Sequence, residues 1–255
     1  MKFSANLGFL WTNNTLPEAI HAAHKAGFQA VECHWPYDTD PSLVRTALQE
    51  TGLRMFGLNT RRGDVAGGEN GLSALVGRET EARAAIDEAV TYATQIEAGA
   101  IHVMAGFAEG PEAHRCFVEN LRYACRAASE AGITILIEPL NRYDAPGYFL
   151  QTTAQASDII SEIDLPNLKL MFDCYHVQLM EGDITHKLGA LQDIIGHIQF
   201  ASVPDRGTPD HGELNYAHVF AEIDRLGWDM PLGAEYKPQG ATEDSLGWMN
   251  KLGRP

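Results

Sequence analysis

The segment Ile135-Leu136-Ile137-Glu138-Pro139-Leu140-Asn141 decides the fold, because here a short apolar strand ends in a single acid. Three later apolar runs also end in one polar side chain, LKLMFD at Asp173, IIGHIQ at Gln199 and MPLGAE at Glu235. A polar side chain at the carboxyl end of a buried parallel strand lies where a barrel gathers its chemistry. Four such strand ends can therefore converge on one site.

Short apolar runs alternate with amphipathic helical segments along the chain. The predicted strands are Phe3–Asn6, Ala30–His34, Arg54–Asn59, Ala100–Met104, Thr134–Glu138, Lys169–Asp173, Gly196–Phe200 and Leu232–Tyr236. Thr15-x-x-Glu18 and Asp40-Pro41 are typical of helix starts, and Gly27, Gly52, Gly132 and Gly227 of helix ends. Eight strand and helix units predict one α/β domain over residues 1–255, a (β/α)8 TIM barrel.

The composition limits the partners. The 255 residues carry 19 Lys and Arg against 34 Asp and Glu, a net charge of −15, so we expect no nucleic-acid partner. No apolar run reaches the length of a membrane span, and the first residues resemble a strand more than a signal peptide. Four cysteines without a CxxC pair favour reduced thiols, and we expect a cytoplasmic protein. The sequence allows a homo-oligomer without specifying one.

Two loops are longer than a barrel needs. Residues 60–77 follow the third predicted strand and contain five glycines, and residues 201–215 follow the seventh. Long loops in a compact domain usually carry function. We expect both on the catalytic face, with the 60–77 loop as a mobile lid.

The four strand ends supply three carboxylates and one amide oxygen. Oxygen-only ligand sets suit Mg²⁺ or Mn²⁺, so Glu138, Asp173, Gln199 and Glu235 are predicted to bind a divalent cation. The alternative for any single acid is that it caps the next helix or pairs with a surface arginine. Four consecutive strands with the same ending favour the metal site.

Other side chains near these strand ends are candidates for binding the substrate. His176 follows Asp173 by three residues, and His102 lies in the fourth predicted strand. Three ionised carboxylates around a divalent cation leave a charge of about −1, so an anionic substrate would need nearby cations. Arg206 and Lys237 are the candidates.

Segments across nearly the whole chain resemble the hydroxypyruvate isomerase family of xylose isomerase-like TIM barrels. They are FSANLGFLW, KAGFQAVE, GLNTRRGDVAGGENGLSALVGRE, IHVMAGF, ILIEPLN, FDCYH, HIQFASVPDRGTPDHGELNY and GAEYKPQGATEDSLGW. The resemblance implies that Glu138, Asp173, Gln199 and Glu235 hold the metal and that the two glutamates are the catalytic acid and base. The related ketose 3-epimerases have histidine at the position of Gln199.

The chain departs from the family pattern at two places, in loops that the resemblance implies line the substrate. Arg61-Arg62 stands where an apolar or Pro-Pro pair is expected, and Gly207-Thr208 replaces bulkier residues. The resemblance implies that a 2-keto-3-hydroxy acid, hydroxypyruvate in the first place, becomes a 2-hydroxy-3-aldehyde through an enediolate. A 2-oxo-tetronate isomerase, a ketose 3-epimerase, a metal-dependent endonuclease and a catalytically silent barrel are the alternatives.

Overall fold

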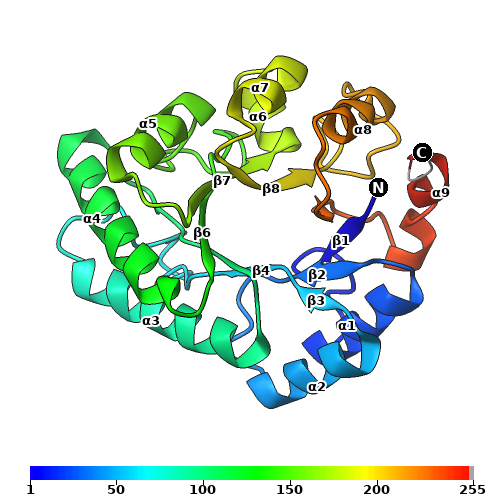
Figure 1. Ribbon diagram of the computed structural model, residues 1–255, viewed down its shortest axis with the longest axis horizontal. Helices are drawn as coiled ribbons and strands as arrows, with labels where there is room; N and C mark the ends of the chain where they lie inside the picture. Colours follow the sequence, from blue (N-terminus) through cyan, green and yellow to red (C-terminus); the bar gives the residue numbers. More distant parts are fainter. Residues whose placement is uncertain (253–255) are drawn as a thin grey trace.

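The computed structural model describes residues 1–252, in which short parallel strands alternate with helices. The strands are β1 (Phe3–Asn6), β2 (Ala30–Glu32), β3 (Arg54–Met55), β4 (Gly57–Asn59), β5 (Ala100–His102), β6 (Thr134–Ile137), β7 (Leu168–Asp173), β8 (Ile195–Phe200) and β9 (Leu232–Ala234). The helices are α1 (Leu16–Lys25), α2 (Pro41–Thr51), α3 (Glu79–Ile96), α4 (Gly110–Ser129), α5 (Thr153–Ile163), α6 (Cys174–Met180), α7 (Ile184–Leu191), α8 (Tyr216–Arg225) and α9 (Trp248–Leu252), with a 3₁₀ turn η1 (Thr242–Ser245). They surround the strands (Figure 1).

The sheet is a parallel barrel with one interrupted strand. Its order is β3-β2-β1-β9-β8-β7-β6-β5-β4, and only Phe56 separates β3 from β4. The Phe56 amide donates to the Val31 carbonyl at 2.6 Å and the Cys33 amide to the Gly57 carbonyl at 3.0 Å, so both pieces lie along β2. The predicted (β/α)8 barrel is confirmed, with its third strand divided in two.

The helix boundaries follow the predicted signals. The Thr15 amide donates to the Glu18 carboxylate at 2.9 Å, and the Asp40 carboxylate accepts from the Ser42 amide at 2.8 Å. Gly27, Gly52, Gly132 and Gly227 all have φ between 66° and 89°, the left-handed geometry that ends helices. The predicted strands were too long at their carboxyl ends, because β2 ends at Glu32, β5 at His102 and β9 at Ala234.

The barrel interior is apolar only at one level. Ala100, Leu136 and Met171 form a small buried cluster against Phe56, while the large core lies between the strands and the helices. Above this cluster the inward positions become polar toward the carboxyl ends of the strands, where Glu138 and Gln199 lie. All four cysteines are buried and free.

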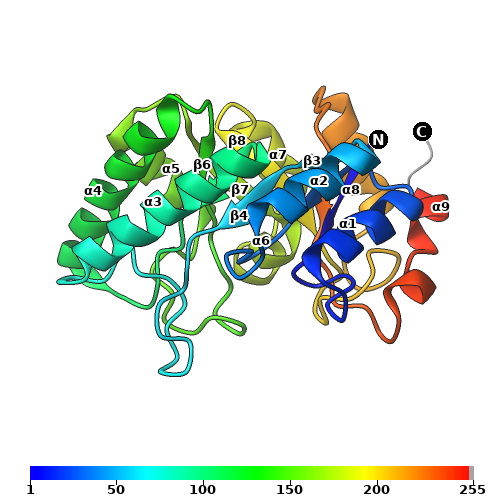
Figure 2. The same cartoon turned by 90° about the horizontal axis from the view of Figure 1, so that it is seen from below.

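Both long loops lie on the face to which the strands point. The cyan segment after β4 projects far beyond the barrel (Figure 2). Residues of both loops line an open cavity of about 1130 Å³ together with Glu138 and Glu235. Among residues 1–252, no helix is long and apolar enough to cross a membrane.

Candidate active site

The four predicted metal ligands come together at the carboxyl ends of β6, β7, β8 and β9. Glu138 and Glu235 are the first residues beyond β6 and β9, Asp173 ends β7, and Gln199 lies opposite Asp173 in the register of β7 with β8. All are buried, with exposed fractions of 6% for Glu138 and Glu235, 1% for Asp173 and 3% for Gln199. Ligand atoms of Glu138, Asp173, Glu235 and His176 lie within 4.8 Å of one another.

The interpretation of Asp173 as a helix cap accounts for only one of its two carboxylate oxygens. Its Oδ1 accepts from the Tyr175 amide at 2.8 Å and caps α6, whereas its Oδ2 is buried without a hydrogen-bond partner in the described chain. Glu138 Oε1 and Gln199 Oε1 are also buried without a hydrogen-bond partner in the described chain. Three buried oxygens without donors carry a high desolvation cost unless a cation meets them, so this donor set fits a divalent metal ion.

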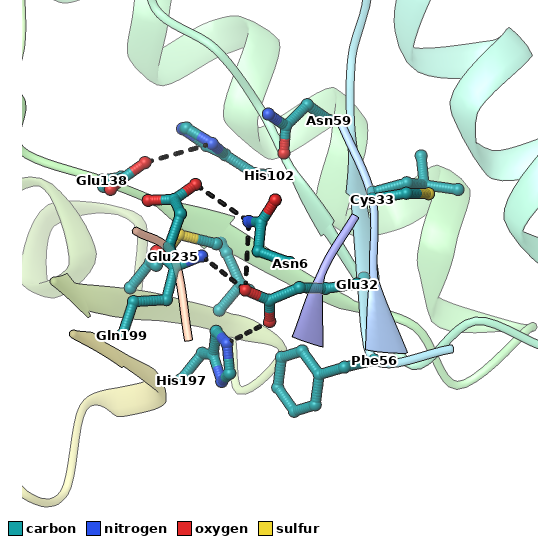
Figure 3. A pocket seen from close by; sticks show the side chains of 14 residues that line it. Asn6, Glu32, Cys33, Phe56, Asn59, His102, Glu138, His197, Gln199 and Glu235 are labelled. Carbon is teal, nitrogen blue, oxygen red and sulfur yellow. Dashed lines mark hydrogen bonds and ion pairs between the residues drawn. The ribbon is translucent and has the colours of Figure 1, made fainter. Parts of the chain in front are cut away.

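Glu235, in contrast, has partners on both oxygens. Its Oε1 accepts from Asn6 Nδ2 at 2.9 Å and lies 3.1 Å from His34 Nε2, and its Oε2 accepts from Arg206 Nη2 at 2.7 Å. These bonds fix the carboxylate at the rim of the acidic cluster, between the barrel interior and the open cavity (Figure 3).

The carboxylates of this cluster differ in their acid strength. Burial, with the charges of Glu235 and Asp173, raises the pKa of Glu138 well above its ordinary value of 4.5. Burial and Glu235 raise the pKa of Asp173 from 3.8 to about 8. Burial acts on Glu235 too, but Arg206 and His34 outweigh it and lower that pKa. The crowding of negative charge that raises the first two pKa values would be relieved by a bound cation.

The two predicted histidines lie beside Glu138. Burial lowers the pKa of His176 to about 3 and that of His102 to about 4, so both rings are neutral near pH 7. His176 Nδ1 accepts from the Asn141 amide at 3.0 Å, which places the ring proton on Nε2. That N–H lies 3.8 Å from Glu138 Oε1 and can donate to a substrate oxygen. His102 Nδ1 is 3.5 Å from Glu138 Oε2.

The two predicted cations occupy different parts of the cavity. Arg206 is mostly buried between the rings of Phe9 and Tyr175, and it also lies 3.4 Å from the Asp144 carboxylate. Its charge is thus already shared by acids of the site. Lys237 is exposed at the cavity mouth, and its amide donates to the Arg206 carbonyl at 2.7 Å.

Sequence reasoning missed a buried network beneath the predicted metal ligands. Glu32 Oε1 accepts from Gln199 Nε2 at 2.9 Å and from Asn6 Nδ2 at 3.1 Å, and Glu32 Oε2 lies 2.6 Å from His197 Nε2 (Figure 3). Because the Glu32 carboxylate accepts from the NH₂ group of Gln199, the amide oxygen of Gln199 is left free for the predicted cation. Glu32 ends β2, but the predicted strand ran on to His34, so the strand-end rule did not single out Glu32.

Comparison with known proteins agrees with this architecture. Residues 20–252 match the model of the family described as xylose isomerase-like TIM barrel. A Brucella melitensis structure solved as an AP endonuclease of family 2 superposes with a TM-score of 0.94 at 37% identity, over 98% of both chains. The chain therefore belongs to the xylose isomerase-like TIM barrels.

Curated relatives place it more narrowly. It is 43% identical over 258 residues to the 2-oxo-tetronate isomerase of Cupriavidus necator, covering 99% of each chain. It is 38% identical over 255 residues to the hydroxypyruvate isomerase of Escherichia coli, covering 98% of each. The chain is an enzyme of the hydroxypyruvate isomerase family, which includes these relatives.

Proposed function

We propose that this enzyme isomerises a small 2-keto-3-hydroxy acid, in the first place hydroxypyruvate to tartronate semialdehyde. The observation that carries the proposal is the placement of two buried glutamates, Glu138 and Glu235, in one cluster with Asp173 and His176. A reaction that moves a proton between adjacent carbons needs one group to remove it and another to return it. The names of the two curated relatives support this class of substrate.

Glu138, Asp173, Gln199 and Glu235 would hold the cation, Mg²⁺ or Mn²⁺. When bound, such an ion polarises the substrate carbonyl and makes the neighbouring C–H more acidic. One glutamate then takes a proton from C3 of the substrate, the hydroxyl proton moves to the former carbonyl oxygen, and the other glutamate returns a proton to C2. No atom is gained or lost, because substrate and product are isomers.

The neutral histidines and the loops act on the enediolate that forms between these steps. The His176 Nε2–H can donate to an oxygen that gains negative charge, and His102 lies on the other side of the same carboxylate. Arg206 keeps Glu235 ionised and oriented. Of the two cations predicted to bind the substrate carboxylate, Arg206 already pairs with Glu235 and Asp144, and Lys237 lies exposed at the cavity mouth. Closure of the 60–77 loop would keep water from the intermediate.

Three alternatives lead to different expectations. A 2-oxo-tetronate isomerase would use the same groups on a substrate one carbon longer. A ketose 3-epimerase would use the glutamates on a neutral sugar, and the epimerase structures that resemble this chain at 16–21% identity share its fold. An endonuclease would need a surface that attracts phosphates, which a net charge of −15 opposes.

A substrate panel tests the proposal. Hydroxypyruvate, 2-oxo-tetronate, dihydroxyacetone, erythrulose and fructose are incubated with the enzyme and Mg²⁺ or Mn²⁺, and the products are followed by NMR. We expect conversion of the acids with kcat/KM well above that of the neutral ketoses. An enzyme that prefers the neutral ketoses would contradict the proposal.

A further inference from the structure

Arg62 is a cation of the cavity that has no carboxylate partner among residues 1–252. Its guanidinium carbon lies 3.7 Å from the centre of the Trp35 ring, and the side chain makes neither a hydrogen bond nor an ion pair within the described chain. The neighbouring Arg61 differs, because it points away from the cavity and pairs with Glu88 at 2.7 Å. Burial lowers the pKa of Arg62, with no anion opposing this effect.

The other charged side chains of the cavity, apart from Lys237 and Glu138, have partners of opposite charge. Arg206 is held by Glu235 and Asp144, and Glu69 pairs with Arg78 at 2.7 Å. Lys237 is exposed, and its flexible ammonium loses conformational entropy when it is held in one place. In a chain with a net charge of −15, Arg62 is a half-buried arginine that lines the same cavity as Glu138 and Glu235 and pairs with neither.

Arg62 is also held in place. Its carbonyl accepts from the Gly71 amide at 2.9 Å, and the indole N–H of Trp35 donates to the Thr60 carbonyl at 3.1 Å. These hydrogen bonds connect the base of the loop to the residue on which Arg62 stacks. A guanidinium stacked on an aromatic ring keeps its N–H edge free, and this planar edge matches a carboxylate.

Charge balance indicates which ligand this edge would meet. Glu138, Asp173, Glu235 and Asp144 contribute about −4 when ionised, Arg206 about +1, and a divalent cation +2, so the loaded site carries about −1. An anionic substrate then gains no net attraction from the acidic cluster. The substrate carboxylate therefore needs a cation that no protein carboxylate already occupies. Among the cavity residues of the described chain, Arg62 is the half-buried cation that meets this requirement.

We propose that Arg62 binds the carboxylate of the substrate and makes this cavity select hydroxy-keto acids over neutral ketoses. The inference rests on the proposed isomerase function and names the residue that sets its substrate class. Arg62 is a specificity residue: it contacts the carboxylate, which is attached to C2 of hydroxypyruvate but takes no part in the proton transfer.

The test compares Arg62→Met with Arg61→Met as the matched control. Methionine keeps an unbranched apolar side chain against Trp35 and removes the charge. For Arg62→Met we expect kcat/KM for hydroxypyruvate to fall about 10- to 150-fold, the loss of one charge-assisted hydrogen bond. For dihydroxyacetone, which has a CH₂OH group in place of the carboxylate, the loss should stay within about threefold, since no charged contact is removed. Arg61→Met should leave both values within about twofold of wild type.

Binding of D-glycerate and glycerol, an inert acid and its neutral analogue, separates this inference from the isomerase function. Titration calorimetry with Mg²⁺ present should show glycerate binding to wild type and to Arg61→Met, and weaker binding to Arg62→Met by the same factor. If the enzyme converted no acid but this difference persisted, the proposed function would fail and the role of Arg62 would stand. Equal or undetectable glycerate binding in wild type and Arg62→Met, or equal kinetic losses on acid and neutral substrates, would overturn the inference.

Discussion

The substitution Glu32→Gln should weaken metal binding although it replaces none of the predicted metal ligands. The Glu32 carboxylate accepts from Gln199, Asn6 and His197 and lies behind the metal ligands. A glutamine here has an NH₂ group that must face one of these donors. His197 could adapt only by moving its ring proton to Nδ1, which is buried without a partner, so we expect Gln199 to relieve the conflict by turning its own amide. That turn removes the amide oxygen from the metal site, and loss of such a supporting contact typically costs about 10- to 100-fold in metal affinity.

Titration of Mg²⁺ or Mn²⁺ into metal-free protein measures this effect, and a double-mutant cycle assigns its cause. In a Gln199→Ala background the amide is already gone, so Glu32→Gln should add less than about threefold. Circular dichroism should show that both variants fold. Wild-type affinity in Glu32→Gln, or losses that simply multiply in the double variant, would refute the role of Glu32 in orienting Gln199.

Three further predictions concern the catalytic pair, the loop and the effect of pH. Glu138→Gln and Glu235→Gln should each lower kcat by about 10²-fold or more with the fold retained, since this is the scale of general acid–base catalysis. Wild-type turnover in either variant would show that the substituted residue is not part of the catalytic pair. Limited proteolysis should cut the 60–77 loop in the free protein and cut it more slowly with Mg²⁺ and D-glycerate bound, whereas equal rates would argue against a lid. In the metal-free fold the pKa of Asp173 rises from 3.8 to about 8, so between these pH values the folded state holds a proton that the unfolded chain releases. The free energy of unfolding in EDTA should therefore fall as pH rises from about 4 to 8. The gain in Tm on adding Mg²⁺ should therefore be larger at pH 8 than at pH 5, and the opposite order in thermal scans would contradict the crowding of charge in the site.

The fold could be predicted because local signals and the global pattern agree. Each helix start and glycine end described above has a cause within a few residues, and each strand is a short apolar run. The carboxyl ends of the strands were less predictable. Glu138 and Glu235 leave the hydrogen-bonded ladder to face the site, and a pattern of alternating side chains does not show where the ladder stops.

The site could be predicted only in part, for a similar reason. Glu138, Asp173, Gln199 and Glu235 follow from one rule about strand ends. The partners of those residues depend on distances between strands far apart in sequence, such as the 229 residues that separate Asn6 from Glu235. The space for the Glu32 network also depends on Gly233, where an added Cβ would lie 2.6 Å from Glu32 Oε1.

The charges were the least predictable feature. Sequence position gave Arg206 and Lys237 the same expected role, but burial separates them: Arg206 is enclosed among acids and Lys237 lies in solvent. From the sequence, Arg62 could be recognised only as a departure from the family pattern. Its stacking on Trp35 brings together the loops that follow two different strands, which no local pattern encodes.

Conversion of hydroxypyruvate in D₂O tests the central claim most directly. Protein stripped with EDTA and protein restored with Mg²⁺ or Mn²⁺ are compared by ¹H NMR at equal concentration. We predict tartronate semialdehyde only in the restored samples, with deuterium at C2, because the glutamate that returns the proton exchanges with solvent. Equal conversion by stripped protein would contradict the metal site, and a product that keeps the substrate's own hydrogen at C2 would contradict proton transfer through the two glutamates.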